Sequence, residues 1–499
     1  MSTVSHFSPS PLPEYGPVVP SLTRCSPPAP GPNNPPLTHG RHVDDFGDKI
    51  LRTQYFGGAV PAGQVWRAKD IFKNVFVTTA KPLVDRYGAD NLPDPAILTS
   101  LTNENQPGST AYMFQKTYEG EWSFDVFFDS NEVKGKLDGA VLDGGLAAAG
   151  TAFEARFERT FPRVAEFSDK HREMAKHVTA NLVGGIGYFH GEWLADRSSA
   201  QDEEDYGEAA PKDRKPEVMP AQELLTATPS RSFFPRGFYW DEGFHLLHIG
   251  AWDNDLSLEI LKSWVGLIDR DGWVPREQIL GDEARSRVPA DFQAQYPTHA
   301  NPPTLVLAVT AYIDRLKAAG VSLDSLDLTE EEGTAPEELS SLMVHSPRRA
   351  GAFLRSIYAP LRRHYLWFRR TQRGQVRLWG RRAPNGKEGY RWNGRTRDHV
   401  LTSGLDDYPR ARVPHVGELH VDLLSWVGSF AKTMGEIATF LGEEFEEDGE
   451  EYEDDLDGVL ANLEMHWSEE DNMYCDLSVD SDGNNPLPNI VFPAYPSVS

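Results

Sequence analysis

The feature that most constrains the fold is a series of apolar stripes with a helical period, which begins about 150 residues into the chain. Met174, Val178 and Leu182 recur every four residues, and Gly184-Gly185 then favours the end of a helix. Stripes of the same kind occur at Ile260/Leu261, Trp264 and Leu267/Ile268, at Leu305, Val309, Ile313 and Leu316, and at Leu423, Val427, Phe430, Met434, Ile437 and Leu441. Amphipathic helices separated by long aromatic and acidic loops favour a mainly α architecture of the α/α type, with a functional site on loops at one end.

The rest of the chain differs in composition. Because 499 residues are too many for one compact core, two or more structural units are expected. Residues 1–40 are rich in Pro, Ser and Gly without a hydrophobic period, which predicts a disordered or extended segment. Residues 70–79 and 111–128 predict strands. The charged runs at residues 198–216 and 443–457 predict solvated loops or helix connections.

Composition also excludes several classes of ligand. A net charge of −26 argues against nucleic acid as a partner, because phosphate binding requires clustered Lys and Arg. Only Cys25 and Cys475 are present, so neither a disulfide framework nor a Cys/His zinc site is expected. The EF-hand-like residues 476–489 have Ser478 at the first ligand position and Asn489 in place of the bidentate Glu, which argues against calcium. We therefore expect no metal and no other cofactor.

Membrane and export signals are not visible in the sequence as written. It has no run of 18 apolar residues, and its N-terminus lacks the basic and apolar regions of a secretory signal. We therefore expect no membrane span and see no route into a secretory compartment.

Three loop segments combine aromatic and acidic residues: residues 232–250 (SFFPRGFYWDEGFHLLHIG), 271–289 (DGWVPREQILGDEARSRVP) and 402–410 (TSGLDDYPR). Each has an ordinary structural explanation when taken alone. Acid–Arg clusters are usually ion pairs, an Asp pair between Gly and Pro often forms a turn, and a Trp at a helix start is often part of the core. Glu242 and His245 in particular are expected to pair inside the fold. The occurrence of all three segments in one chain favours a binding site.

The residue types of these segments suit a sugar. Flat aromatic rings cover the C–H faces of a sugar ring, and carboxylates bind its hydroxyl groups. Glycoside cleavage needs a carboxylic acid and a second carboxylate, and the acid keeps its proton best in a partly buried pocket. The candidates are Phe233, Phe234, Tyr239, Trp240, Trp273 and Tyr408 beside Asp241, Glu277, Asp406 and Asp407. Nucleophilic Ser or Cys chemistry has weaker support, because no GxSxG motif occurs and Cys475 lacks a recognisable context.

Longer motifs closely resemble glycoside hydrolase family 63, the family of the processing α-glucosidases. They are TATPSRSFFPRGFYWDEGFH (226–245), DGWVPREQILGDEARSRVPADFQAQ (271–295), HANPPTL (299–305) and TSGLDDYPR (402–410). The likeness also runs through residues 184–191, 417–426 and 466–480. The likeness covers roughly residues 65–480, and fungal members are the most similar.

The resemblance implies an (α/α)6 toroid preceded by a β-sandwich, both incomplete here. We expect a Pro-rich disordered tail at residues 1–45 and a partial β-sandwich with a linker at 46–150. The toroid is expected at 151–480, without its C-terminal helices, and a divergent tail at 481–499. The family's membrane anchor has no counterpart in this sequence.

The resemblance also implies an activity and its residues. The family removes the terminal α-1,2-linked glucose from the triglucosylated N-linked oligosaccharide, with inversion and without a metal, at the lumenal face of the endoplasmic reticulum membrane. Asp406 falls at the position of the general acid, and a monomer is expected. The residues implied in substrate binding are Trp240 and Asp241 of the glycone motif, Asn301, Arg236, Glu277, Asp407 and Arg410, with Phe234 and Tyr239 in the pocket wall.

The general base of the family is a Glu beyond the region of likeness, and no residue of this chain matches it. Three interpretations follow: an α-glucosidase whose sequence is incomplete, a sugar-binding or interaction module without activity, or an unstable fragment without function. Adjacent coding sequence with a Glu-bearing C-terminal segment and an N-terminal anchor would support the first interpretation. Glycan binding without turnover would support the second, and a non-cooperative melt the third.

Overall fold

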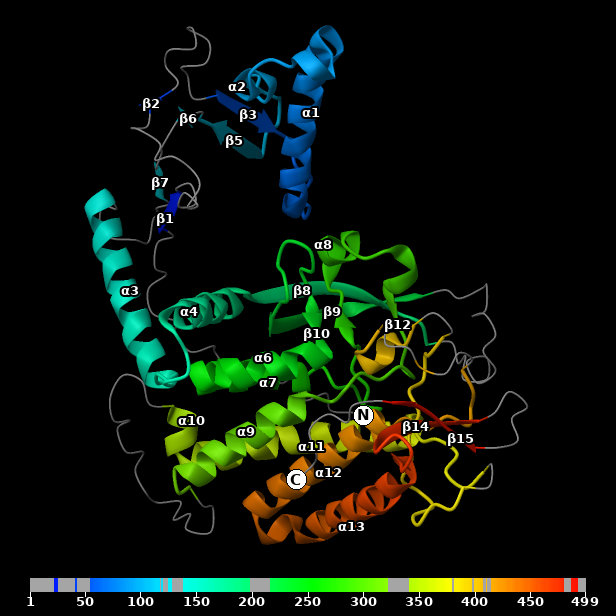
Figure 1. Cartoon of the computed structure of the whole chain (residues 1–499). Coiled ribbons are helices and arrows are strands. Elements are labelled where there is room, and N and C mark those ends of the chain that lie inside the picture. Colours follow the sequence, from blue (N-terminus) through cyan, green and yellow to red (C-terminus); the bar gives the residue numbers. More distant parts are fainter. Residues whose placement is uncertain are drawn as a thin grey trace, which may run out of the picture. The chain divides into compact units, whose positions relative to one another are not determined.

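The computed structural model describes residues 22–25, 41–42, 54–116, 118–119, 124–127, 138–197, 216–321, 341–378, 381–396, 399–406, 410, 414–479 and 486–491. The chain divides into two compact units, Met1–Arg159 and Thr160–Ser499. Helices predominate, which confirms the mainly α class (Figure 1). Each unit is described by itself.

The first unit combines short strands with helices. Its elements are β1 (Leu22–Cys25), β2 (Arg41–His42), β3 (Gln54–Gly58), α1 (Ala68–Tyr87), α2 (Pro95–Leu98), β4 (Glu104–Asn105), β5 (Ala111–Gln115), β6 (Tyr118–Glu119), β7 (Phe124–Phe127) and α3 (Gly139–Thr160). The strands form a β4-β3-β5 sheet and the pairs β1-β7 and β2-β6. The strands β5, β6 and β7 confirm the prediction for residues 111–128, of which Thr117, residues 120–123 and Phe128 lie outside the described residues.

The prediction of a strand at residues 70–79 is wrong, because this segment lies inside helix α1. Ile71 and Phe72, then Val75 and Phe76, are half-buried, whereas the pairs between them are exposed. Pairs of apolar residues four apart share one helical face, and this spacing outweighs the strand propensity of the β-branched residues.

The second unit contains most of the helices. They are α4 (Asp169–Gly184), α6 (Tyr239–Trp252), α7 (Asn254–Val265), α8 (Gly281–Ser286), α9 (Leu305–Ala318), α10 (Leu342–His345), α11 (Pro347–Thr371), α12 (Val421–Leu441) and α13 (Glu446–Leu463). These bounds confirm the helices predicted from the apolar stripes. The stripe of α4 nevertheless leaves Met174 and Val178 exposed, and only Leu182 reaches the core.

The described strands of the second unit form three small sheets. They are β8 (Ile186–Ala195), β9 (Glu217–Ala227), β10 (Gly237–Phe238), β11 (Glu277–Gln278), β12 (Ala294–Gln295), β13 (Trp467–Ser468), β14 (Met473–Val479) and β15 (Pro486–Val491). Their orders are β12-β8-β9, β10-β11 and β13-β14-β15. The β10-β11 pair holds two of the sequence motifs together.

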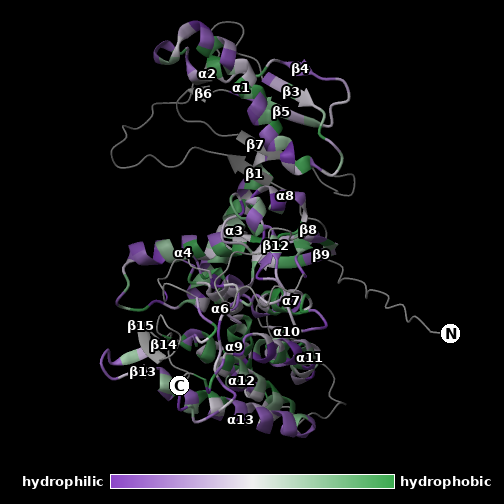
Figure 2. Cartoon of the chain, turned by 90° about the vertical axis from the view of Figure 1, so that its right-hand side faces the viewer, coloured by the Kyte–Doolittle hydropathy of each residue, from purple (hydrophilic) through white to green (hydrophobic). Residues whose placement is uncertain are grey.

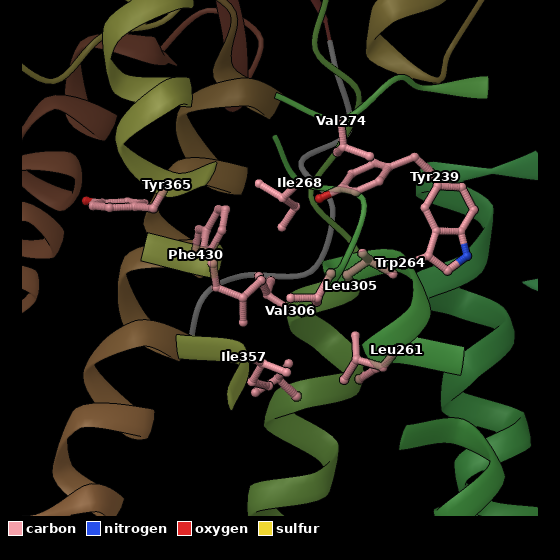
Figure 3. Packing of buried hydrophobic residues seen from close by; sticks show 14 of the residues in the cluster. Tyr239, Leu261, Trp264, Ile268, Val274, Leu305, Val306, Ile357, Tyr365 and Phe430 are labelled. Atoms are coloured by element: carbon pink, nitrogen blue, oxygen red, sulfur yellow. The ribbon is translucent and has the colours of Figure 1, made fainter. Parts of the chain in front are cut away.

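One hydrophobic core joins the helices of the second unit. Trp264 and Leu261 of α7, Leu305 of α9, Ile357 of α11 and Phe430 of α12 belong to it and are almost completely buried (Figure 3). Each such side chain contributes about 1.5–3 kcal/mol when it is removed from water. The core therefore provides a rigid base for the loops at the helix ends.

The acidic run at residues 443–457 is a helix rather than a loop over most of its length, since α13 begins at Glu446. Figure 2 shows hydrophilic and hydrophobic residues interleaved along it. Tyr452 and Val459 face the core, while Asp455 accepts hydrogen bonds from Tyr365 and Arg369 of α11. The run thus forms an amphipathic helix, and its exposed acidic residues make up the outer face. The other charged run, residues 198–216, lies almost entirely outside the described residues.

Among the described residues, no helix combines the length and the apolar character needed to cross a bilayer. The same part of the chain contains no group of three or more His, Cys, Asp or Glu placed to hold a metal ion.

Candidate active site

The start of α6 brings two of the motifs into contact. Phe238 has extended backbone and pairs with Glu277 across β10 and β11. The amide of Tyr239 donates to the carbonyl of Arg276 at 2.9 Å. The chain then turns into the helix, so that Trp240 and Asp241 occupy its first turn, where a carboxylate is favoured by the helix dipole. Segment 232–250 is thereby fixed against segment 271–289.

Asn301 connects this helix start to the third motif. Its Oδ1 accepts from the amide of Trp240 at 3.3 Å, and its Nδ2 donates to the carbonyl of Thr402 at 3.1 Å. Thr304, from the same HANPPTL segment, donates from Oγ1 to the carbonyl of Trp240 at 2.5 Å. Asn301 is buried, and the bonds of its amide to neighbouring backbone make it a bridge between loops that are distant in sequence.

The loop that carries Asp406 is closed by its own hydrogen bonds. The amide of Val400 donates to the carbonyl of Asp406 at 3.2 Å, and Ser403 Oγ donates to the carbonyl of Val400 at 2.9 Å. Gly404 has the left-handed φ of 76° that this turn requires. The side chain of Asp406 is exposed at the end of the loop. Asp407 lies outside the described residues.

Partly exposed aromatic rings surround the helix start. Trp240 and Phe244 meet edge to face with ring centroids 5.7 Å apart. Phe234 and Phe238 make a similar contact at 6.0 Å, and the guanidinium of Arg236 lies 4.7 Å from the ring centroid of Phe238. Phe234 remains 43% exposed. These rings offer flat apolar surface beside a carboxylate, which is the surface a sugar ring requires.

Asp241 is the half-buried carboxyl group of this region. Its pKa is raised above the ordinary value, mainly because burial disfavours the charged form, and the nearby charges of Glu242 and Glu277 act in the same direction. His245 opposes this shift. A carboxyl group in this setting serves as a strong hydrogen-bond partner for hydroxyl groups.

Arg236 and Glu277 form a buried ion pair. Arg236 Nε lies 2.8 Å from Glu277 Oε2, and Arg276 contacts the other carboxylate oxygen at 2.8 Å. The amide of Glu277 donates to the side chain of Gln295 at 3.2 Å. With two guanidinium groups on its carboxylate, Glu277 is held firmly where its strand pairs with Phe238.

Glu242 lies inside the fold, as expected, and its partners there include His245. Its carboxylate is fully buried and accepts from Thr226 Oγ1 at 2.9 Å and the amide of Ala227 at 3.0 Å. His245 Nδ1 lies 3.1 Å from Glu242 Oε2. These contacts tie α6 to β9.

Tyr239 lies in the core and does not form a pocket wall, which corrects the sequence-based assignment. It is 2% exposed, and its hydroxyl group lies 2.8 Å from Nε2 of His364. Burial lowers the pKa of His364 to about 4, so the ring is neutral. Its Nδ1 donates to the carbonyl of Gly272 at 2.7 Å, which leaves Nε2 to accept from Tyr239. Helix polarity explains the difference, since adjacent residues of a helix point to different faces.

Arg410, which follows the loop of Asp406, occupies a buried charge cluster. It lies 2.7 Å from Asp422 at the start of α12 and 2.6 Å from Asp476 of β14. Asp476 also accepts from the amide of Val421 at 2.9 Å. Because only three residues separate Asp406 from Arg410, this cluster anchors the chain within about 14 Å of Asp406.

Sequence reasoning overlooked three residues of this region. Phe244 could have been found because it lies four residues after Trp240, on the same helical face. Thr304 and Thr402 act through their contacts with Trp240 and Asn301, for which the sequence carries no local signal.

The structure thus gathers exposed aromatic rings, the half-buried Asp241 and a loop that presents Asp406. This combination is typical of a carbohydrate-active protein. Residues 137–487 match the sequence profile of the glycosyl hydrolase family 63 C-terminal domain, and the chain therefore belongs to glycoside hydrolase family 63.

The names of two curated relatives describe a glycosidase. The chain is 41% identical over 459 residues to a probable mannosyl-oligosaccharide glucosidase of Schizosaccharomyces pombe, covering 87% of this chain and 56% of that protein. It is 35% identical to the mannosyl-oligosaccharide glucosidase of Saccharomyces cerevisiae, covering 91% and 57%. The chain thus spans a little over half the length of these relatives.

A solved structure of the same family is a weaker match. The GH63 mannosylglycerate hydrolase of Thermus thermophilus aligns with a TM-score of 0.34 and 13% identity, covering 52% of this chain and 65% of that one.

Proposed function

We propose that the chain is the larger part of the catalytic region of an α-glucosidase that removes the terminal α-1,2-linked glucose from the triglucosylated N-linked oligosaccharide. Family membership and the names of the fungal relatives support this activity. The helices of the second unit would then belong to an (α/α)6 toroid, and the strands of the first to a β-sandwich. The protein would act as a monomer at the lumenal face of the endoplasmic reticulum.

The observation that carries the proposal is the meeting of motifs around Trp240. Asn301 holds the amide of Trp240 and the carbonyl of Thr402, and Gly404 lies against the Trp240 indole. Segments from separate parts of the sequence thus converge on one aromatic residue. A structural role alone does not require an exposed acidic residue on the loop that is held there.

In this proposal Asp406 protonates the oxygen of the leaving sugar as the bond to the anomeric carbon breaks. An inverting enzyme needs a second carboxylate that activates water on the opposite face of the sugar. We assign that role to no residue of this chain. Asp406 therefore supplies the acid half of the reaction.

The neighbouring residues would hold the glucose. The indole of Trp240 would cover its C–H face, and Asp241 would bind its hydroxyl groups, with Phe234 on the same aromatic surface. Asn301 and the Arg236–Glu277 pair would keep Trp240 and Phe238 in place. We place Asp407 beside the substrate on the likeness of its motif alone, and Arg410 behind the loop as its anchor.

The test is glucose release from an α-1,2-linked glucose trisaccharide. The purified chain is assayed beside Asp406→Asn, with a thermal melt of both proteins. If the chain carries all the groups it needs, we expect release by wild type and none by the variant, at equal melting temperatures.

A cooperative melt with trisaccharide binding but no release supports the sugar site while placing the base elsewhere. If the folded chain neither binds nor cleaves the trisaccharide, the proposed function is wrong. Release by Asp406→Asn at the wild-type rate contradicts the assignment of the acid.

A further inference from the structure

A cavity of about 440 Å³ at the C-terminal end of α11 is lined mainly by cationic side chains. They are Arg369, Arg370, Arg373 and Lys387, with Leu366 as the apolar neighbour. No acidic residue of the described chain lines the cavity, although the sequence has 75 Asp and Glu against 49 Lys and Arg. The cavity is open to solvent, since Arg370, Arg373 and Lys387 are exposed, and it has room for a small hydrated anion.

Two of these cations are held by protein groups. Arg369 pairs with Glu388 at 2.7 Å and with Asp455 of α13, while its Nε is buried without a hydrogen-bond partner among the described residues. Arg370 donates to the carbonyl of Asp271 at 2.9 Å. These contacts fix the guanidinium groups at one side of the cavity.

The other two cationic residues, Arg373 and Lys387, have backbones held by hydrogen bonds, whereas their side chains have no partner among the described residues. Within the described part of the chain, neither Arg373 nor Lys387 makes a side-chain hydrogen bond or ion pair. Arg373 forms a backbone bridge with Tyr390. The amide of Lys387 donates to Asn385 Oδ1 at 2.7 Å, and the backbone of Asn385 is itself held by the buried Asn462.

Part of this charge has an ordinary explanation. Cations near the last turn of a helix interact favourably with the helix dipole, and Arg369 and Arg370 lie in that turn of α11. Arg373 and Lys387 lie beyond the helix, however, and Lys387 comes from a separate turn. Helix stabilisation does not explain why they converge on the same cavity.

We propose that this cavity binds a phosphate group, either as the free anion or as the terminal group of a phosphomonoester. Guanidinium forks match the geometry of phosphate oxygens, and a lysine adds a compact charge. The backbone contacts keep the residues that carry these charges near one another before the anion arrives, so that only their side chains have to be ordered. The proposal concerns a site separate from the sugar site and does not depend on glycosidase activity.

The salt concentration matters for the experiment. The net charge of −26 repels anions at long range, but at 0.1 M ionic strength the Debye length is about 10 Å, so that distant carboxylates are screened. Glu388 and Asp455 contact Arg369 directly and offset its charge, so the free charges of the cavity are those of Arg370, Arg373 and Lys387. Titrations are therefore made at constant ionic strength of about 0.1 M.

The test is a titration of the full chain with inorganic phosphate, followed by calorimetry and by the shift in Tm, with chloride as the reference anion. The variant Arg373→Gln/Lys387→Gln removes the two unoccupied cations and keeps much of the length of their stems. Its matched control is Arg348→Gln/Arg355→Gln, which removes the same charge from the N-terminal half of α11. Arg355 is 15 residues from Arg370, or about 22 Å along the helix axis.

We expect saturable binding of phosphate to wild type, at least about tenfold weaker binding to the first variant and an unchanged affinity in the control. A parallel titration with glucose 6-phosphate distinguishes the two sources: equal or tighter binding identifies a phosphomonoester, and no binding identifies the free anion. The absence of saturable phosphate binding, or an equal loss in both variants, overturns the proposal.

Discussion

Gly404 lies directly against the indole of Trp240. A Cβ atom at position 404 would come within 2.7 Å of Trp240 Cε2, and the left-handed φ of 76° at this residue disfavours any side chain. The glycine of the TSGLD motif therefore has two functions: it permits the turn that precedes Asp406, and it lets the turn reach the aromatic ring.

Gly404→Ala disturbs both functions, and comparison with a glycine that has only the left-handed backbone separates them. We expect a loss of about 1–2 kcal/mol from the left-handed backbone, and a further loss because the indole must move. Gly320→Ala is the matched control, since Gly320 has a φ of 71° and no atom within 4 Å of the added Cβ. Urea unfolding and calorimetry with the trisaccharide measure both effects. Sugar affinity should fall only in Gly404→Ala. If both variants bind the trisaccharide with equal affinity, the contact between Gly404 and Trp240 has no role in sugar binding.

The bridge of Asn301 predicts a larger effect than a single hydrogen bond. Asn301→Ala leaves the amide of Trp240 and the carbonyl of Thr402 without partners, which costs about 1–3 kcal/mol for each buried group. Thr304→Val removes only the bond to the carbonyl of Trp240 and keeps the shape of the side chain. We expect Asn301→Ala to weaken trisaccharide binding more than Thr304→Val does. If Asn301→Ala lowers stability but leaves the affinity unchanged, the bridge supports the fold alone.

The helices were predictable because burial on one face is a local property of the sequence. Leu423, Phe430 and Ile437 recur with the helical period and are all completely buried on α12. Residues 70–79 show the limit of this approach. Their β-branched and aromatic residues are typical of a strand, but the spacing of these residues also fits one face of a helix. Only the burial of alternate pairs distinguishes the two.

The motifs of the candidate site could be found in the sequence, but not the roles of their members. Asn301 bridges residues that are 61 and 101 positions away, and no local pattern encodes such a contact. Tyr239 and Trp240 are adjacent aromatic residues with different surroundings, because the helix buries Tyr239 inside the core and leaves Trp240 half-buried at its edge, against Gly404. The sequence shows the residue types, and the helix phase decides which of them a ligand can reach.

Tyr239→Phe tests this assignment against Trp240→Phe. Loss of the Tyr239 hydroxyl group leaves Nε2 of the buried His364 without its partner, so we expect a loss of about 1–3 kcal/mol in stability and no change in sugar affinity. Trp240→Phe should have the opposite signature, with weaker trisaccharide binding and a small change in Tm. If Tyr239→Phe weakens trisaccharide binding as much as Trp240→Phe does, Tyr239 contacts the sugar and the assignment to the core is wrong.

The cluster of Arg410, Asp422 and Asp476 predicts a dependence of stability on pH. Burial raises the pKa of Asp476 from 3.8 to about 7 in spite of the attraction of Arg410, since Asp422 shares the same cation. The folded chain therefore holds this proton more tightly than the unfolded chain does. The corresponding stability is complete below pH 4, falls as the pH rises and is lost near pH 7, with a slope of at most about 1.4 kcal/mol per pH unit.

Asp476→Asn removes the titrating group, so the fall between pH 4 and 7 should become shallower in the variant. Asp454→Asn, an exposed aspartate of α13, is the control and should follow wild type. Urea unfolding at closely spaced pH values gives the slopes for the three proteins. Because Asp476 and Asp422 hold the arginine that follows the Asp406 loop, the protection of residues 400–406 from hydrogen exchange, relative to the intrinsic rate at each pH, should fall with pH in wild type and not in Asp476→Asn. Parallel pH profiles of wild type and Asp476→Asn would show that Asp476 stays ionised and that Arg410 holds the loop independently of pH.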